Sequence, residues 1–380
     1  MKRCLTLIAV SGAMMMASCH KAEKMATDDN GHLYDNGGIA VIDLYGTWYE
    51  MGRQYGLLAK GRMDDVLCYL DRKIGPEPEK MASATDIANR LYSKYPKHLK
   101  DFFDGVVATS GLSLDKVKMC NAVEYVEGVF MCSAMAVWGD FADGKLVFGR
   151  NYDAVNYSDI DRDVVVTVYH PAEGNAVATV GYAGELYCVN GFSSSGLFVE
   201  LNNGMPSAGA DIDWSLCPST TSLFDMLFSA RNLDDVDAFF RNTSSFASFI
   251  IGVADKDQAR SYEWCSEGVR RGDVTTEPGL MISTNHYVND GWTFTVPSDA
   301  DSWNSITRRR NLAEMAMQNK GHIDADKMME IMSTPIENGG PKHNLTRYQM
   351  IAVPEDMTLY IYVPCIGKWT EVGLGEYFGR

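Results

Sequence analysis

The residues with the clearest chemical potential lie in one stretch, VFMCSAMAVWGDFADGKLVFGRNYD, which covers positions 129–153. Cys132 lies near the start of this stretch, and Arg150 and Asp153 close it. An Asp-Gly pair separates two apolar runs, a pattern typical of a β-hairpin. The sequence therefore predicts that a thiol and a charged pair lie on neighbouring strands.

The cysteines indicate a free thiol rather than a disulfide framework or a metal site. Of the nine cysteines, Cys4 and Cys19 fall in the first 19 residues, which leaves seven. An odd number leaves at least one thiol unpaired, and a free thiol can act as a nucleophile. No C-x-x-C or H-E-x-x-H spacing occurs. We therefore expect no metal and no organic cofactor.

A cysteine nucleophile needs a base to take its proton, and no base stands out beside Cys132. The seven histidines are scattered along the chain, and no G-x-S-x-G elbow occurs. A nucleophile that is the first residue of its chain can use its own α-amine, whose pKa is about 8. That solution requires cleavage of the peptide bond before the nucleophile. Spatial pairing of Cys132 with a distant histidine stays open.

The pattern along the chain changes near Cys132. From about position 46 to 127, apolar residues recur at three- and four-residue steps, which predicts helices. After Cys132, short apolar runs predict strands, and helical stretches interrupt them at 219–242 and 305–334. Helices first and many antiparallel strands afterwards indicate an α+β fold built from layers.

Several separated motifs resemble those of the N-terminal-nucleophile (Ntn) hydrolase superfamily. The resemblance is to the branch that holds acyl-coenzyme A:6-aminopenicillanate acyltransferases, which is related to choloylglycine hydrolases and penicillin V acylases. It extends over nearly the whole chain from Gly46 onward. The motifs, in order, are GTWYEMGRQYGLLAK, MCSAMAVWGDFADGKLVFGRNYD, GLFVELNNG, FIIGVADKDQARSYEW, MISTNHY and the arginine-bearing SITRRRNL.

The resemblance implies a four-layer αββα sandwich in residues 132–380, preceded by a helical segment at 46–131. Cys132 matches the nucleophile of this superfamily, so the Met131–Cys132 bond would be cut autocatalytically and the helical segment would become a separate chain or propeptide. These acyltransferase precursors usually have glycine before the cysteine. The bulkier Met131 is a departure that would slow the acyl shift that starts the cleavage.

The resemblance also assigns roles to four further residues. Arg150 would stabilise the thiolate, and Asp153 would contact the α-ammonium group of the nucleophile. Asn202, from GLFVELNNG, and Asn285, from MISTNHY, would lie near the oxyanion, where amide N–H donors stabilise negative charge.

The function implied is hydrolysis of a linear, non-peptide amide bond in an N-acylated small molecule through a thioester on Cys132. Two alternatives stay open. The same residues could move the acyl group to an amine acceptor, or the chain could be a catalytically silent lipoprotein that binds a ligand at the cell surface. The net charge of −16 argues against a nucleic-acid partner. The sequence leaves open whether the chain forms a homo-oligomer.

The first 19 residues predict export. A basic start, a short apolar run and small residues are typical of a signal peptide. The segment ends in MASC, which resembles the bacterial lipobox, so Cys19 would carry lipid and residues 20–45 would form a polar tether. We therefore expect a lipoprotein of the bacterial cell envelope that meets the membrane only through its lipid anchor.

Replacing Cys19 tests the predicted anchor. The wild-type chain should incorporate labelled fatty acid and partition into detergent, whereas Cys19→Ala should do neither, because the acceptor thiol is gone. Metabolic labelling and detergent phase separation measure both properties. Equal labelling of the two proteins would contradict the prediction.

Overall fold

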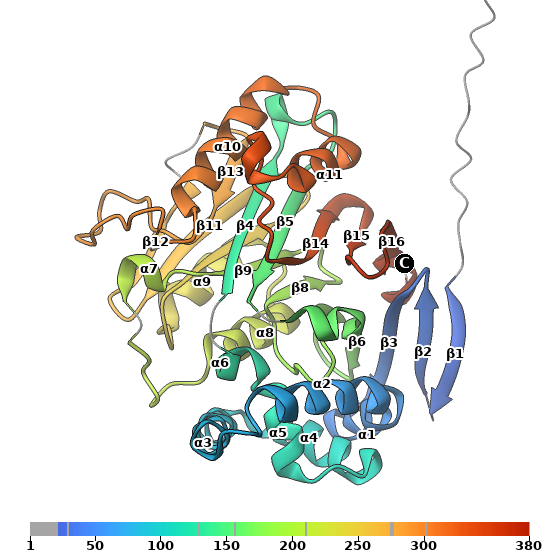
Figure 1. Ribbon diagram of the computed structural model, residues 1–380. Coiled ribbons are helices and arrows are strands. Elements are labelled where there is room, and N and C mark those ends of the chain that lie inside the picture. Colours follow the sequence, from blue (N-terminus) through green and yellow to red (C-terminus); the bar gives the residue numbers. More distant parts are fainter. Residues whose placement is uncertain are drawn as a thin grey trace, which may run out of the picture.

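The structure is a computed structural model that describes residues 22–28, 30–127, 130–155, 157–209, 211–273, 277–300 and 302–379 (Figure 1). The predicted signal peptide and lipidation site, Cys19, lie outside the described residues. No helix in the described ranges is long and apolar enough to cross a membrane.

The segment predicted to be a tether, 20–45, instead contains three strands. They are β1 (Glu23–Asp28), β2 (Gly31–Asn36) and β3 (Ile39–Gly46). β3 is buried from Ile39 to Leu44, because its apolar and β-branched side chains fit the middle of a sheet. The prediction of a tether was wrong here, since the glycines and acidic residues around β3 concealed this apolar run.

Helices fill the next segment. They are α1 (Trp48–Leu58), α2 (Lys60–Lys73), α3 (Pro78–Lys94), α4 (Lys97–Ser110), α5 (Leu114–Asn121) and α6 (Val123–Glu127). Thr47 and Glu50 form a reciprocal capping box that begins α1. α1 packs closely against α4. A Cβ atom added at Gly52 would lie only 2.1 Å from the Phe102 carbonyl oxygen. Glycine at this crossing therefore lets the two backbones touch.

Two sheets follow. The first sheet has ten strands in the order β1-β2-β3-β6-β7-β8-β9-β10-β11-β12, and the second has six in the order β13-β4-β5-β14-β15-β16. All neighbouring strands pair antiparallel except β3 and β6, which are parallel. The strands not yet given bounds are β4 (Phe130–Val137), β5 (Val147–Ala154), β6 (Val164–Pro171), β7 (Val177–Tyr182), β8 (Asn190–Ser193), β9 (Phe198–Asn203), β10 (Phe249–Ala254), β11 (Ala259–Cys265), β12 (Gly268–Arg271), β13 (Leu280–Ser283), β14 (Thr346–Val353), β15 (Thr358–Tyr362) and β16 (Trp369–Gly373).

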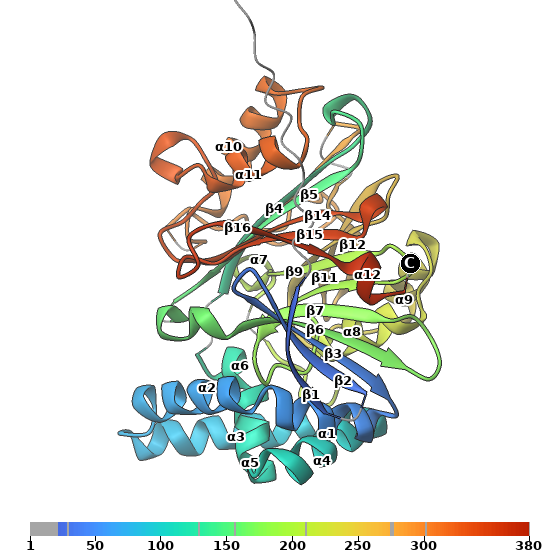
Figure 2. The ribbon, with the colours of Figure 1, turned by 90° about the vertical axis from the view of Figure 1, so that its right-hand side faces the viewer.

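The two sheets stack face to face, with helices on both outer sides (Figures 1 and 2). β4 contacts β9 across the interface, where the rings of Phe148 and Phe198 meet edge to face at 4.9 Å. α10 and α11 cover the six-stranded sheet, and α1, α8 and α9 pack against the ten-stranded sheet. The α+β class and the four-layer αββα order are therefore confirmed. The later helices are α7 (Met205–Ala208), α8 (Ser219–Ser229), α9 (Leu233–Asn242), α10 (Ser305–Gln318), α11 (Ala325–Ser333) and α12 (Leu374–Tyr377).

The pairing of β4 with β5 decides which side chains meet at the site. Cys132 lies opposite Tyr152, and Ala134 lies opposite Arg150. Because side chains alternate along a strand, Cys132, Tyr152 and Arg150 share the face toward the ten-stranded sheet. Asp153 lies on the other face, toward α10. The predicted hairpin thus forms, and it separates the two charged residues between its faces.

Candidate active site

The thiol of Cys132 is buried between the two sheets and contacts a buried arginine. Arg150 Nη2 lies 3.2 Å from Sγ and also donates to the Leu201 carbonyl oxygen at 2.7 Å. Arg150 Nη1 forms an ion pair with Glu200, and both side chains are fully buried. Burial raises the pKa of the Cys132 thiol to about 12, although Arg150 opposes the rise. With Cys132 joined to Met131, the thiol is therefore protonated at neutral pH.

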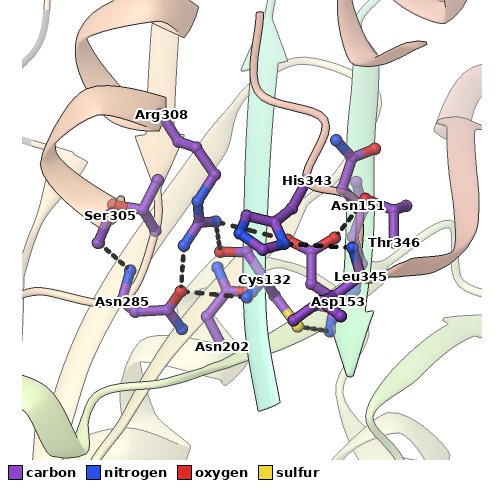
Figure 3. Close-up of polar contacts among 12 residues, drawn as sticks. Cys132, Asn151, Asp153, Asn202, Asn285, Ser305, Arg308, His343, Leu345 and Thr346 are labelled. Carbon is purple, nitrogen blue, oxygen red and sulfur yellow. Dashed lines mark hydrogen bonds and ion pairs between the residues drawn. The ribbon is translucent and has the colours of Figure 1, made fainter. Parts of the chain in front are cut away.

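Two other side chains hold the backbone of Cys132 (Figure 3). Asn285 Oδ1 accepts a hydrogen bond from the Cys132 N–H at 3.1 Å. Arg308 donates to the Cys132 carbonyl oxygen at 2.5 Å and to Asn285 Oδ1 at 2.7 Å. The Nδ2 group of Asn285 donates to the Asn203 carbonyl oxygen at 2.9 Å. These partners fix the orientation of the Asn285 side-chain amide, whose oxygen, a hydrogen-bond acceptor, faces Cys132.

Asp153 lies on the α10 side of β5, away from the thiol. Its Oδ1 accepts from the Thr346 hydroxyl at 2.6 Å, and its Oδ2 lies 3.7 Å from Arg308. Burial raises the pKa of Asp153, and Arg308 opposes that rise. The contacts found for this carboxylate therefore reach Cys132 through Arg308, not through the Cys132 nitrogen.

Asn202 lies beside Cys132 on the facing sheet. Its Nδ2 donates to Glu200 at 3.2 Å and to the Ser283 hydroxyl at 3.0 Å. Its Oδ1 is buried and has no hydrogen-bond partner among the described residues. The structure thus brings Asn202 to the site, but its donor group is bound to Glu200 and Ser283.

Two residues of the site were missed from the sequence. Arg308 belongs to the run of three arginines in SITRRRNL, and its full burial distinguishes it from the exposed Arg310. Glu200 is a charged residue within the apolar strand β9, and a charge in such a run could have indicated a site residue. It faces the six-stranded sheet, because it is two positions from Phe198.

The histidines near the site do not pair with the thiol. His286 Nδ1 and the Ser305 hydroxyl form a hydrogen bond at 2.7 Å, and burial lowers the pKa of His286 to about 4. The Leu345 N–H donates to His343 Nδ1 at 3.2 Å, and burial lowers the pKa of His343. Within the described ranges no histidine is hydrogen-bonded to Cys132. No group of three or more His, Cys, Asp or Glu in these ranges could hold a metal ion.

A cavity of about 280 Å³ opens beside Cys132. Most of its walls are apolar, which suits the hydrocarbon part of a ligand. The cavity is lined by Glu124, Tyr125, Cys132, Tyr152, Val189, Leu201, Asn203, Met205, Ile212, Thr220, Phe246, Ala247 and Phe249.

Comparison with known proteins gives matches only at the level of solved structures, because neither the protein-family models nor the curated proteins contain a match. The chain is similar to an N-acylethanolamine-hydrolyzing acid amidase ortholog of Caenorhabditis elegans, with 19% identity and a TM-score of 0.44 over 59% of this chain and 93% of that one. It is similar to conjugated bile acid hydrolase from Clostridium perfringens, with 13% identity and a TM-score of 0.44 over 65% and 93%. It is also similar to penicillin V acylase from Agrobacterium tumefaciens, with 10% identity and a TM-score of 0.37 over 61% of this chain and 83% of that one.

Removing Glu200 should show how strongly the fold depends on the buried ion pair. Glu200→Ala leaves Arg150 buried without its carboxylate, so the free energy of unfolding should fall by about 3–5 kcal/mol. Asp64→Ala is the matched control, because it breaks the exposed pair with Lys60 and should cost at most about 1 kcal/mol. Both substitutions would be made in the uncut Cys132→Ala background, so that the extent of the Met131–Cys132 cut cannot differ between them, and urea denaturation would measure the free energy of unfolding of each. Equal losses in the two variants would contradict the prediction.

Proposed function

We propose that this chain is a cysteine amidohydrolase of the N-terminal-nucleophile type, active once the Met131–Cys132 bond is cut. It would hydrolyse a linear amide in an N-acylated small molecule through a thioester on Cys132. We further propose, from the sequence, that the protein is exported and held at the cell envelope by a lipid on Cys19.

One observation carries the proposal: buried polar side chains converge on the thiol, the nitrogen and the carbonyl oxygen of a single residue. Arg150 contacts the thiol of Cys132, Asn285 accepts from its nitrogen, and Arg308 binds its carbonyl oxygen. Burying two guanidinium groups is costly unless each one finds acceptors, and Arg150 and Arg308 find some of theirs at Cys132. A structural cysteine needs no such surroundings, whereas a nucleophile must be held in one geometry.

Cleavage before Cys132 would supply the base that the uncut site lacks. In the uncut chain the Cys132 nitrogen is an amide, which cannot take a proton from the thiol. A free α-amine at the same place has a pKa of about 8 and could accept that proton. Asn285 Oδ1 already faces this nitrogen, so it would hold the amine in place after the cut.

The reaction then follows in two balanced steps. The Cys132 thiolate attacks the amide carbonyl, the C–N bond breaks, and the leaving amine takes a proton from the α-ammonium group. A water molecule next attacks the thioester and gives its proton to the α-amine, and the C–S bond breaks to release the acid. Arg150 favours the thiolate in both steps, because its positive charge lies 3.2 Å from the sulfur.

The cavity beside the thiol offers a place for the acyl group. In the thioester the acyl group stays bonded to Sγ while the amine has left, so it must fit next to Cys132. The apolar walls supplied by Leu201, Met205 and Phe249 would bind hydrocarbon by removing it from water.

The mass of the purified chain tests the cut. Wild-type protein should appear as two pieces divided between Met131 and Cys132, and Cys132→Ala should stay whole, because the alanine variant lacks the attacking sulfur. Cys265→Ala, which removes another buried thiol, should cleave like wild type. Intact-mass spectrometry reads out all three. A cut Cys132→Ala chain would mean that another protease acts, and the proposal of autocleavage would fail.

Two substitutions at Asn285 separate its acceptor from its donor. Asn285→Asp keeps an oxygen toward the Cys132 nitrogen and Arg308 but loses the Nδ2 donor, whereas Asn285→Ala loses both. If Asn285 mainly positions the nitrogen, the alanine variant should lose about a hundredfold in rate and the aspartate variant much less.

The rate of release of nitroaniline from a short-chain acyl nitroanilide, with the extent of the Met131–Cys132 cut measured in parallel, checks this prediction. Equal losses in the two variants would instead assign Asn285 the role predicted from the sequence, an oxyanion donor.

A further inference from the structure

The cavity beside Cys132 is built from both sides of the proposed cut. Glu124 and Tyr125 lie on α6, before Met131, and the other lining residues lie at or after Cys132. Glu124 is the one carboxylic acid among these lining residues. An acidic group in a mostly apolar wall beside a nucleophile is a feature that the proposed chemistry does not use.

Glu124 is buried without a cation. Its side chain accepts hydrogen bonds from the Tyr152 hydroxyl and, at 3.2 Å, from the Tyr187 hydroxyl. No Lys, Arg or His of the described part of the chain lies within ion-pair distance of it. Arg150 acts on Glu124 from further away, but its guanidinium is bound to Glu200. The carboxyl group therefore has hydrogen-bond donors but lacks a counter-charge.

A second buried carboxyl group adds to the acidic groups here that lack a positive counter-charge. Glu185 accepts a hydrogen bond from the Tyr182 N–H at 2.8 Å and is as buried as Glu124. Burial raises the pKa of Glu124 to about 7, and burial together with Glu124 raises the pKa of Glu185. A positive charge placed in the cavity would stabilise the ionised form of Glu124 and offset part of the free energy that burying a carboxylate costs.

We propose that Glu124 makes the cavity selective for a short acyl chain that ends in an ammonium group. This inference rests on the proposed function for the reaction at Cys132, but the binding site it describes already exists in the uncut chain. Tyr152 lies opposite Cys132 on the paired strand and donates to Glu124. Glu124 is thus one tyrosine side chain away from the nucleophile, within reach of the far end of a chain bonded to Sγ.

The two parts of the ligand would be bound by different forces. The methylene groups would lie against Leu201, Met205 and Phe249, and burial of this hydrocarbon favours binding for any acyl chain. Selectivity would come from the tip, since an ammonium group can donate to the Glu124 carboxylate and neutralise it. A methyl tip would leave that carboxyl group without a counter-charge, and a hydroxyl tip would supply a hydrogen bond alone.

Binding to the uncut chain tests the inference without any turnover. Full-length Cys132→Ala would be titrated calorimetrically with hexylammonium chloride and with hexanol. Hexylammonium should bind about ten- to a hundredfold more tightly, as a hydrogen bond between charged groups would give. Adding Glu124→Gln should remove this preference, and adding the exposed Glu79→Gln instead should leave it unchanged.

Turnover of matched nitroanilides by the wild-type enzyme extends the test to the reaction. The ω-aminohexanoyl compound should show a kcat/KM at least about tenfold above those of the ω-hydroxyhexanoyl and heptanoyl compounds, and Glu124→Gln should lose this advantage. If none of the three is cleaved, the proposed amidase function fails for these amides while the binding titration still decides the role of Glu124.

The inference is overturned if Cys132→Ala binds hexanol as tightly as hexylammonium. It is also overturned if a folded Glu124→Gln variant, judged by its thermal melting, keeps the full preference. Should that variant fail to fold, the comparison of the two ligands on the Cys132→Ala chain decides alone.

Discussion

Two fully buried arginines set the conditions for the rest of the site. Each guanidinium group has left water, and such a charge persists in a protein only when acceptors surround it. Arg150 is paired with Glu200, and Arg308 lies near Asp153. Both arginines also contact Cys132, one at the thiol and the other at the carbonyl oxygen. The charge balance therefore ties β4, β5, β9 and α10 to a single residue, and it fixes the stacking of the two sheets at that point.

The features that were predictable from the sequence are those set by nearby residues. The hairpin that carries Cys132 and Arg150 follows from two apolar runs around an Asp-Gly turn. The helices before Cys132 follow from the spacing of apolar residues. β3 was missed because its run of six buried residues, Ile39–Leu44, lies between turn-forming residues, and only its partners in the sheet show that it is central.

The features that were not predictable depend on long-range packing. The sequence does not distinguish which of the three successive arginines in SITRRRNL reaches the site. Only the contact of α10 with β4 shows that it is Arg308. An asparagine at position 285 supplies an amide, but the sequence does not show whether its oxygen or its NH2 group faces Cys132. Asp153 comes three positions after Arg150, so alternation along β5 places the two side chains on opposite faces. Which of them shares the face of Cys132 depends on the register of β4 with β5. β4 ends at Val137 and β5 begins at Val147, so a connection longer than a two-residue turn sets that register, and a one-residue change in it would exchange the two faces relative to Cys132.

The parallel pairing of β3 with β6 joins chain segments from before and after Cys132 in one sheet. A cut at Met131–Cys132 would leave this pairing intact, so the two pieces would stay together as one folded body. Once unfolded, however, they would be separate molecules. Refolding would then be bimolecular and would depend on protein concentration, because the covalent link that brought β3 to β6 is gone. The lifetime of the mature protein would therefore be governed by how slowly it unfolds rather than by a reversible equilibrium.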